Sequence, residues 1–377
     1  MPTVRSEDVL PLRMASLLLG PPAVRTPHDI VTWFGAMQAQ DLASAHWSFG
    51  VRIPGSTVPD IEQATADRLI LRTWPMRGTV HFVPPEDAKW MLELTGVRAL
   101  AGAAGRRAQV GLTEPIVNQA VEVLRTALSG GNRMTRGECV ALLIDAGVHT
   151  ASQHGYHLLW YASQIGVTCI GPQEGNEQTF VLLHEWVPKP NSPSRDEALA
   201  MLALRYFRSH GPTTRQDFAG WTGLTATDAK RGIEGAGDAL VTVSMEGVPH
   251  VLAAALLDDA AVVRTSKRKG GELLLLPGFD EYILGFKDRT LMVPDAFRDR
   301  IVPGNNGVFM PTMVDGGRVI GTWKRTIKKA RVDLQALPFE PLTKQQTSAF
   351  QRAGDRYAQF LQLECAVVPH QGAHSAA

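Results

Sequence analysis

Cysteine is scarce in this sequence, and its placement excludes a disulfide-stabilised fold. The 377 residues contain three cysteines, Cys139, Cys169 and Cys365, which are far apart and odd in number. This usage is typical of proteins in a reducing compartment, and no pair has the spacing of a zinc site. We therefore expect a cytoplasmic protein without structural disulfides.

Long apolar runs are also missing. Residues 14–19 and 273–276 are largely apolar, but both are far shorter than the roughly 20 residues that a membrane-spanning helix needs. Glu7 and Asp8 stand where a secretory leader would be basic. The sequence thus predicts neither a membrane anchor nor a leader.

Common catalytic motifs are absent as well. The sequence has no glycine loop that would cradle a phosphate, no Gly-x-Ser-x-Gly elbow and no His-Glu-x-x-His. His149, His154 and His157 are close together, but without acidic or thiol partners at ligand spacing they indicate surface or hydrogen-bonding roles. We expect no metal and no cofactor.

The adjacent carboxylates Asp280 and Glu281 allow two interpretations. They could perform acid–base chemistry, which needs such groups at a reacting centre. They could instead pair with basic groups nearby, such as Lys287 and Arg289, and brace a corner of the chain. We favour the structural interpretation, because adjacent carboxylates pair with nearby basic groups more often than they perform catalysis.

The order of elements predicts an α+β fold of three tandem winged helix-turn-helix units and a β-rich C-terminal subdomain. A hydrophobic fraction of 44 % is enough to bury cores in several domains. In each predicted unit, helices precede two strands joined by a turn, which is the order of a winged helix. The predicted units are residues 1–85, 86–187 and 194–271, followed by the subdomain at 272–377.

Local signals support this division. Thr26 and Asp29 predict the start of a helix in the first unit, and residues 69–74 and 79–83 predict two strands around a turn at 75–78. Residues 114–128 and 154–165 predict helices in the second unit.

The later part of the chain has equally clear boundaries. A proline-rich linker at 188–193 precedes the third unit, which ends in a hairpin within residues 240–254. In the C-terminal part, Asp315-Gly316 predicts a hairpin turn, and residues 343–363 predict a closing helix.

Two glutamines, Gln38 and Gln40, follow the second predicted helix. Residues two apart point in nearly opposite directions on a helix, but can face one side in a turn or extended segment. Asp41 can cap the next helix, so we place both glutamines in the turn between two helices. From these residues alone, an ordinary solvent-exposed turn is the simpler interpretation.

The chain resembles the winged-helix DNA glycosylases of the HTH_42 group, in particular the AlkZ-type members associated with self-resistance to azinomycin B. The resemblance covers almost the whole chain and is carried by residues 38–40 (QAQ), 71–81 (LRTWPMRGTVH), 276–282 (LPGFDEY) and 317–325 (GRVIGTWKR). It implies that the three units form a curved DNA-binding channel, with Gln38 and Gln40 as the catalytic pair on its concave side. Some relatives carry Gln-x-Asp, so Gln40 places this chain with the subgroup acting on bulky lesions of antibiotic origin.

The activity that the resemblance implies is removal of N7-alkylated guanines, including both ends of interstrand crosslinks. N7-alkylation gives guanine a positive charge, so the base leaves without a strong acid. The enzyme must orient a water at the sugar and stabilise an oxocarbenium-like species. We expect Gln40 to orient the water and Gln38 to support it. No lysine lies in the motif, so a monofunctional glycosylase is expected.

The expected partner is double-stranded DNA carrying an alkylated guanine or a crosslink, bound by a monomer. A net charge of +1 neither predicts nor excludes this partner, because binding depends on where the basic residues cluster. The hairpin at residues 315–318 is expected to probe a groove of the DNA. The candidate DNA contacts are Arg72, Arg77, His81, Lys267, Arg268, Lys269, Arg318, Trp323, Lys324 and Arg325.

Two other functions remain open on the sequence alone. A winged-helix transcription regulator would bind one undamaged sequence and release no base. A resistance protein that sequesters the alkylating compound would bind it without DNA.

Overall fold

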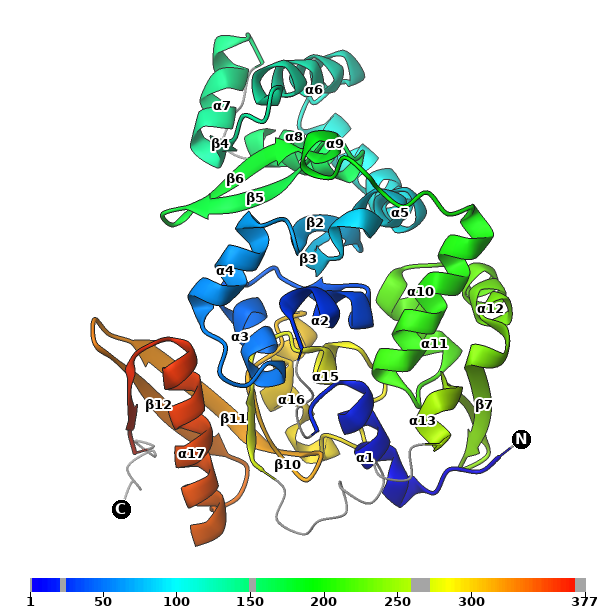
Figure 1. Ribbon diagram of the computed structural model, residues 1–377, viewed down its shortest axis with the longest axis vertical. Coiled ribbons are helices and arrows are strands. Elements are labelled where there is room, and N and C mark those ends of the chain that lie inside the picture. The colour runs from blue at the N-terminus through cyan, green and yellow to red at the C-terminus, as the bar shows by residue number, and fades with distance from the viewer. Residues whose placement is uncertain (1, 21–24, 149–153, 259–271, 370–377) are drawn as a thin grey trace.

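The computed structural model describes residues 2–20, 25–148, 154–258 and 272–369. Figure 1 shows the first helices at the centre of the molecule, with groups of later elements around them. The expected α+β composition is confirmed, since long helices alternate with three separate sheets. No helix in these ranges is long and apolar enough to cross a bilayer.

The N-terminal segment consists of four helices and a hairpin. Thr26 caps the second helix reciprocally with Asp29, as predicted. Arg77 and Gly78, with φ of 55° and 72°, form the two-residue turn of the hairpin. The elements are α1 (Ser6–Ser16), α2 (Pro27–Phe34), α3 (Leu42–Arg52), α4 (Val58–Ala66), β2 (Leu71–Met76) and β3 (Thr79–Val83).

The following segment forms a second hairpin that joins the first in one sheet. The six-stranded order is β1-β3-β2-β5-β6-β4, in which β1 is Met37–Gln38, and Arg72 pairs with Ile170 where the two hairpins meet. The long helix α5 (Ala88–Gln109) was not predicted, whereas the helices expected at 114–128 and 154–165 are confirmed. The other elements are α6 (Glu114–Leu128), β4 (Met134–Thr135), α7 (Arg136–Asp145), α8 (His154–Gln164), β5 (Thr168–Glu174), β6 (Glu177–Leu182) and α9 (Leu183–Trp186).

After the proline-rich linker, four helices and a hairpin form a further group. Asn191 of the linker donates a hydrogen bond to Asp87, the residue that precedes α5, so the linker is held against the start of that helix. The predicted hairpin within residues 240–254 is confirmed. The elements are α10 (Arg195–His210), α11 (Arg215–Thr222), α12 (Ala226–Gly235), β7 (Leu240–Met245), β8 (Val248–Ala253) and α13 (Ala254–Asp258).

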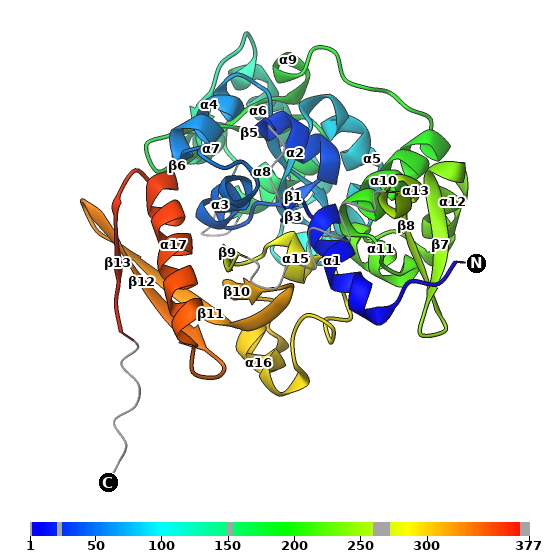
Figure 2. The same ribbon diagram turned by 60° about the horizontal axis from the view of Figure 1, so that its bottom comes forward.

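The C-terminal part is a five-stranded sheet with the order β13-β12-β11-β10-β9, crossed by a helix (Figure 2). The predicted turn at Asp315-Gly316 and the closing helix are confirmed. Tyr357 and Phe360 of that helix pack against Trp47 of α3, which ties the sheet to the N-terminal helices. The elements are β9 (Leu274–Leu276), α15 (Glu281–Leu284), α16 (Arg298–Ile301), β10 (Thr312–Asp315), β11 (Arg318–Ile327), β12 (Arg331–Pro338), α17 (Lys344–Phe360) and β13 (Glu364–Val367).

Candidate functional site

The two glutamines lie on and just after a short strand. β1 (Met37–Gln38) pairs antiparallel with β3 at the edge of the six-stranded sheet, with Gln38 opposite His81. The segment lies between α2 and α3 as expected, but the expected turn is wrong for Gln38, because backbone pairing to β3 extends the chain there, whereas Gln40 lies in a bend. Gln38 is only 9 % exposed, whereas Gln40 is exposed.

Backbone amides hold both glutamine side chains in place. Gln38 Oε1 accepts a hydrogen bond from the Gln40 N–H at 2.7 Å. Gln40 Oε1 accepts one from the Val80 N–H of β3 at 3.2 Å. Each carbonyl oxygen keeps a second lone pair, and each side-chain amide is a two-proton donor. The motif thus presents oriented, uncharged donors and acceptors.

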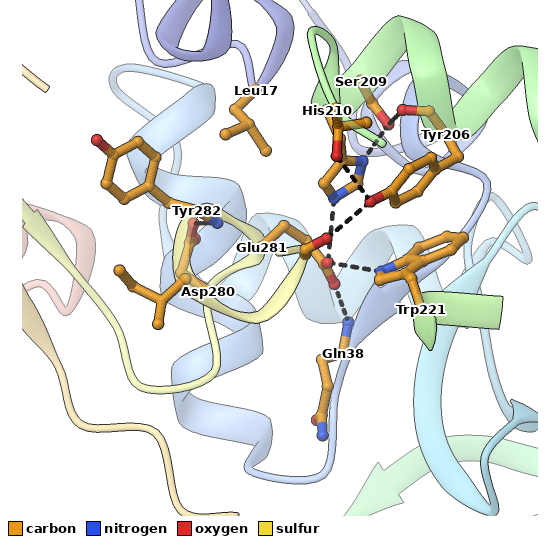
Figure 3. A network of polar contacts seen from close by, with 12 residues as sticks. Leu17, Gln38, Tyr206, Ser209, His210, Trp221, Asp280, Glu281 and Tyr282 are labelled. Atoms are coloured by element: carbon orange, nitrogen blue, oxygen red, sulfur yellow. Dashed lines mark hydrogen bonds and ion pairs between the residues drawn. The ribbon is translucent and has the colours of Figure 1, made fainter. Parts of the chain in front are cut away.

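A buried carboxylate holds β1 from the other side. Glu281 Oε1 accepts a hydrogen bond from the Gln38 backbone N–H at 3.1 Å, and Oε2 accepts one from the Trp221 indole N–H at 2.9 Å. The Gln38 side chain points away from this carboxylate (Figure 3). Because Glu281 begins α15 and Trp221 lies on α11, one side chain connects the glutamine strand to two distant parts of the chain.

His210 completes the surroundings of Glu281. Its Nε2 lies 3.3 Å from Glu281 Oε2, its Nδ1 lies 2.8 Å from Ser209 Oγ, and its ring stacks on Tyr206. Burial alone would raise the pKa of Glu281. The hydrogen bonds from His210, Trp221 and Gln38 outweigh burial and hold the pKa below its usual value, so Glu281 is ionised.

Asp280 braces the same corner with a different partner. It forms a bidentate pair with Arg52, with N–O distances of 2.8 and 3.0 Å, and both side chains are almost completely buried. The bracing interpretation of Asp280 and Glu281 is confirmed. The expected partners Lys287 and Arg289 were wrong, since the fold brings Arg52 and His210 from distant helices instead.

The candidate DNA contacts on the β2–β3 hairpin are mostly turned into the protein. His81 is 0 % exposed, and burial lowers its pKa to about 3, so it is a neutral core residue. The expected contact of His81 with DNA is corrected for this reason. Arg72 is 7 % exposed and donates a hydrogen bond to the Ala39 carbonyl of the motif at 3.3 Å. Arg77 at the turn is exposed and donates to the Trp221 carbonyl.

The C-terminal candidates are divided between core and surface. Trp323 is 1 % exposed and donates its indole N–H to the Leu276 carbonyl, so its expected contact with DNA is corrected. Lys324 and Arg318 are exposed. Arg325 donates to the Tyr357 hydroxyl at 2.7 Å and lies 3.9 Å from Asp41, next to the glutamine motif.

The hairpin turn at 315–318 is packed against α1. The Gly317 carbonyl accepts a hydrogen bond from Tyr282, and a Cβ at Gly317 would lie 3.0 Å from the Leu10 side chain. Gly316 and Arg318 of this turn are exposed, and its expected contact with a DNA groove stays a prediction. The β11–β12 hairpin also projects (Figure 1), with Lys328 and Lys329 exposed near its tip.

The basic loop predicted at Lys267, Arg268 and Lys269 lies outside the described residues. Within the described ranges, no group of three His, Cys, Asp or Glu side chains is placed to hold a metal ion.

One residue that sequence reasoning missed is His46 on α3, which lies near Arg72 and stacks on Phe82. Burial, and then the charge of Arg72, lower its pKa to about 4, so it is neutral. The only sequence signal was its helical spacing of four from Leu42, next to the motif.

Comparisons with known proteins agree on one group. A family model described as DNA glycosylase AlkZ-like matches residues 31–360. The chain is 26 % identical over 367 residues to the interstrand DNA cross-link repair glycosylase of Streptomyces sahachiroi, covering 92 % of this chain and 96 % of that protein. The solved structure of Streptomyces sahachiroi DNA glycosylase AlkZ is similar, with a TM-score of 0.78 and 23 % identity, covering 97 % of this chain and 100 % of that one.

Proposed function

Because the chain belongs to the AlkZ-like DNA glycosylase family, we propose that it hydrolyses the N-glycosidic bond of N7-alkylated guanine in duplex DNA, using Gln38 and Gln40. The observation that carries this proposal is the fixed orientation of both side chains at the edge of the sheet. The proposal includes both ends of an interstrand crosslink, since the Streptomyces sahachiroi relative is named for crosslink repair.

The chemistry requires no ionisable group in contact with the base. The cationic base is already a good leaving group, so the enzyme has to position a water and stabilise charge that develops on the sugar. The second lone pair of Gln40 Oε1 can accept a hydrogen bond from that water and orient it, while the Val80 N–H fixes the side chain. Gln38 supports Gln40 through the Gln40 backbone N–H. The ionised Glu281 holds β1 from behind without touching the substrate.

The fold supports a DNA-binding channel built from the three helix-and-hairpin segments. We interpret these segments as tandem winged helices that bind duplex DNA as a monomer. The projecting β11–β12 hairpin supplies cations for phosphates, including Lys324 and Lys329, which have no acidic partner in the described part of the chain. This arrangement leaves open the edge of the six-stranded sheet at β1, where the glutamines lie. An open edge suits a crosslinked base, which cannot be flipped into a closed pocket.

The biological role follows from the lesion. We propose repair and self-resistance against a DNA-alkylating antibiotic of the azinomycin B kind, in the compartment that holds the DNA. The non-catalytic regulator is disfavoured, because the matching family is one of DNA glycosylases.

The test uses a duplex with one defined N7-guanine interstrand crosslink. The wild-type protein should release base and leave alkali-labile sites on both strands without cutting either strand before alkali. The double variant Gln38→Ala/Gln40→Ala should lose both products, whereas Gln345→Ala/Gln351→Ala, which changes two exposed glutamines of α17, should retain them. Strand cleavage without alkali would contradict monofunctional hydrolysis, and full activity of the double variant would contradict the site.

A further inference from the structure

His210 is a buried histidine to which the hydrolysis of the glycosidic bond assigns no task. It is the last residue of α10, its side chain is 0 % exposed, and its Nε2 lies 3.3 Å from Glu281 Oε2. Figure 3 shows its ring between Ser209 on one side and the carboxylate on the other. Because Glu281 accepts the backbone N–H of Gln38, only one side chain separates His210 from the glutamine motif.

The hydrogen bonds around the ring indicate its charge. Ser209 Oγ lies 2.7 Å from the Arg205 carbonyl oxygen, and a hydroxyl joins a carbonyl at this distance by donating its single proton. His210 Nδ1 lies 2.8 Å from the same Oγ, so Nδ1 has to be the donor in that bond. On the opposite side, the ionised Glu281 can only accept. This arrangement needs a proton on both ring nitrogens, as in an imidazolium.

Aromatic side chains enclose the His210 ring and suit a cation. Tyr206 stacks on it at an interplanar angle of 14°. The centroid distances are 4.6 Å to Tyr206, 5.4 Å to Trp221 and 5.8 Å to both Phe34 and Phe286. Aromatic rings attract a cation within about 6 Å, and more strongly where water is excluded. These rings therefore offset part of the cost of burying a charged histidine.

His210 is also the basic group in contact with Glu281. An ionised carboxylate is buried at low cost only when it is paired and hydrogen-bonded. Arg77 acts on Glu281 through charge, but its guanidinium donates to the Trp221 carbonyl, and no ion pair joins it to Glu281 among the described residues. The acceptor for the Gln38 N–H therefore depends on His210.

We propose that His210 is a positioning residue for base release, which as a buried imidazolium keeps Glu281 ionised and so holds β1 and the glutamine motif in place. His210 does not touch the substrate. The proposal rests on the proposed glycosylase function and adds to it a requirement for one buried proton. It also gives the segment after the linker a part in the chemistry, since His210 and Trp221 come from α10 and α11.

The first measurement determines the charge of His210 without any substrate. Isotope labelling of the histidines gives ring-nitrogen chemical shifts, which distinguish an imidazolium from a neutral ring, and the His210 signals are those missing from His210→Gln. The wild type at neutral pH should show an imidazolium. Glu281→Gln should show a neutral ring, because the carboxylate that stabilises the charge is gone. A neutral His210 in the wild type would overturn the proposal.

The second measurement is single-turnover base release from an N7-methylguanine duplex. His210→Phe keeps an aromatic ring without its hydrogen bonds, and should lower kcat about tenfold with nearly unchanged KM, because the motif shifts while the DNA contacts remain. His210→Gln can still donate to Glu281 and should lose less. The matched control is His250→Phe, which changes another buried histidine of the same segment, with its Nδ1 3.0 Å from the Val248 carbonyl oxygen. This control should keep the wild-type kcat.

A double variant distinguishes positioning from a general loss of packing. His210→Phe/Glu281→Gln should lose about as much kcat as the weaker of its two single variants, since both changes act through one contact with β1. Losses that multiply, or an equal loss in His250→Phe, would overturn the positioning role and leave glycosylase function intact. If melting temperatures show that His210→Phe does not fold, His210→Gln and the wild-type spectra decide the matter. Absence of base release by the wild type would overturn the proposed function, and the positioning role with it.

Discussion

Two hairpins that carry candidate DNA contacts have opposite surroundings. On β2–β3, Arg72 and His81 are buried, and Arg72 is held by the backbone of the glutamine motif. On β11–β12, Lys324 and Lys329 are exposed, with no acidic partner among the described residues. Basic residues on the two hairpins thus perform different tasks, because Arg72 is buried against the glutamine motif, whereas Lys324 and Lys329 lie exposed on a hairpin that projects from the molecule (Figure 1).

This difference distinguishes residues that position the catalytic groups from residues that attract DNA. A catalytic contact has to be held in one geometry, which buried hydrogen bonds provide. A phosphate contact depends on charge and gains little from burial, since desolvation weakens it. We therefore expect changes near β1–β3 to alter the chemical step and stability, and changes on β11–β12 to alter DNA affinity and its salt dependence.

The largest effect should come from the exposed glutamine. Gln40→Ala removes the side chain fixed by Val80 and should lower single-turnover kcat by about 10²–10³, the range for removal of one transition-state contact. Gln38→Ala should cost less, because Gln38 acts through Gln40. The measurement is base release from one N7-methylguanine duplex at saturating protein. A larger loss for Gln38 than for Gln40 would reverse the roles of the two glutamines.

Acid should destabilise the β2–β3 side of the molecule through its buried histidine. Burial, and then the charge of Arg77, lower the pKa of His81 to about 3, below the unfolded value of about 6.5. The unfolded state binds more protons in this window, so the free energy of unfolding falls as pH drops from about 6.5 to 3, by about 1.4 kcal/mol per pH unit for this group. Denaturant titrations between about pH 6.5 and pH 3 measure this free energy of unfolding. His81→Phe should reduce the slope of the free energy of unfolding against pH by the contribution of one proton. The same change at exposed His184 should leave that slope unaltered.

A smaller catalytic effect is expected at Glu281. Glu281→Gln places an amide N–H₂ against donors from Gln38 or Trp221, so β1 loses a fixed partner. We expect about tenfold lower kcat with nearly unchanged KM, and a stability loss of about 1–3 kcal/mol. Glu185→Gln is the control, because Glu185 also accepts two backbone N–H groups, from Gly130 and Gly131, away from the motif. Equal losses of kcat in the two variants would show that Glu281 has no special role.

Local signals were sufficient to predict much of the fold. The Thr26 cap, the turn between β2 and β3, and the closing helix followed from propensity and turn chemistry, which depend on neighbours in sequence. The helix α5 was missed because its apolar side is shared among several partners and its pattern is weak.

The candidate site depended on contacts that sequence spacing does not contain. The strand at Gln38 forms only because β3 and Glu281 pair with its backbone, and Glu281 lies 243 residues away. Asp280 likewise finds Arg52 across 228 residues. Burial of Trp323 was unpredictable for the same reason, since an aromatic beside Lys324 and Arg325 fits both a core strand and a DNA contact. The family resemblance identified the glutamines as candidates, and the structure shows the hydrogen bonds that hold them.

The smallest effect should appear on the projecting hairpin, as a change in salt dependence. Lys324→Ala/Lys329→Ala should weaken duplex binding several-fold at low salt and reduce the slope of log affinity against log salt by about 2, roughly one for each phosphate contact removed. Fluorescence anisotropy with an undamaged duplex measures this without catalysis. Lys230→Ala on α12, whose ammonium pairs with Glu234, removes one charge away from the hairpin and should change the slope little. If the double variant keeps the wild-type slope but loses base release, β11–β12 serves the chemical step, and the division between positioning and attraction fails at this hairpin.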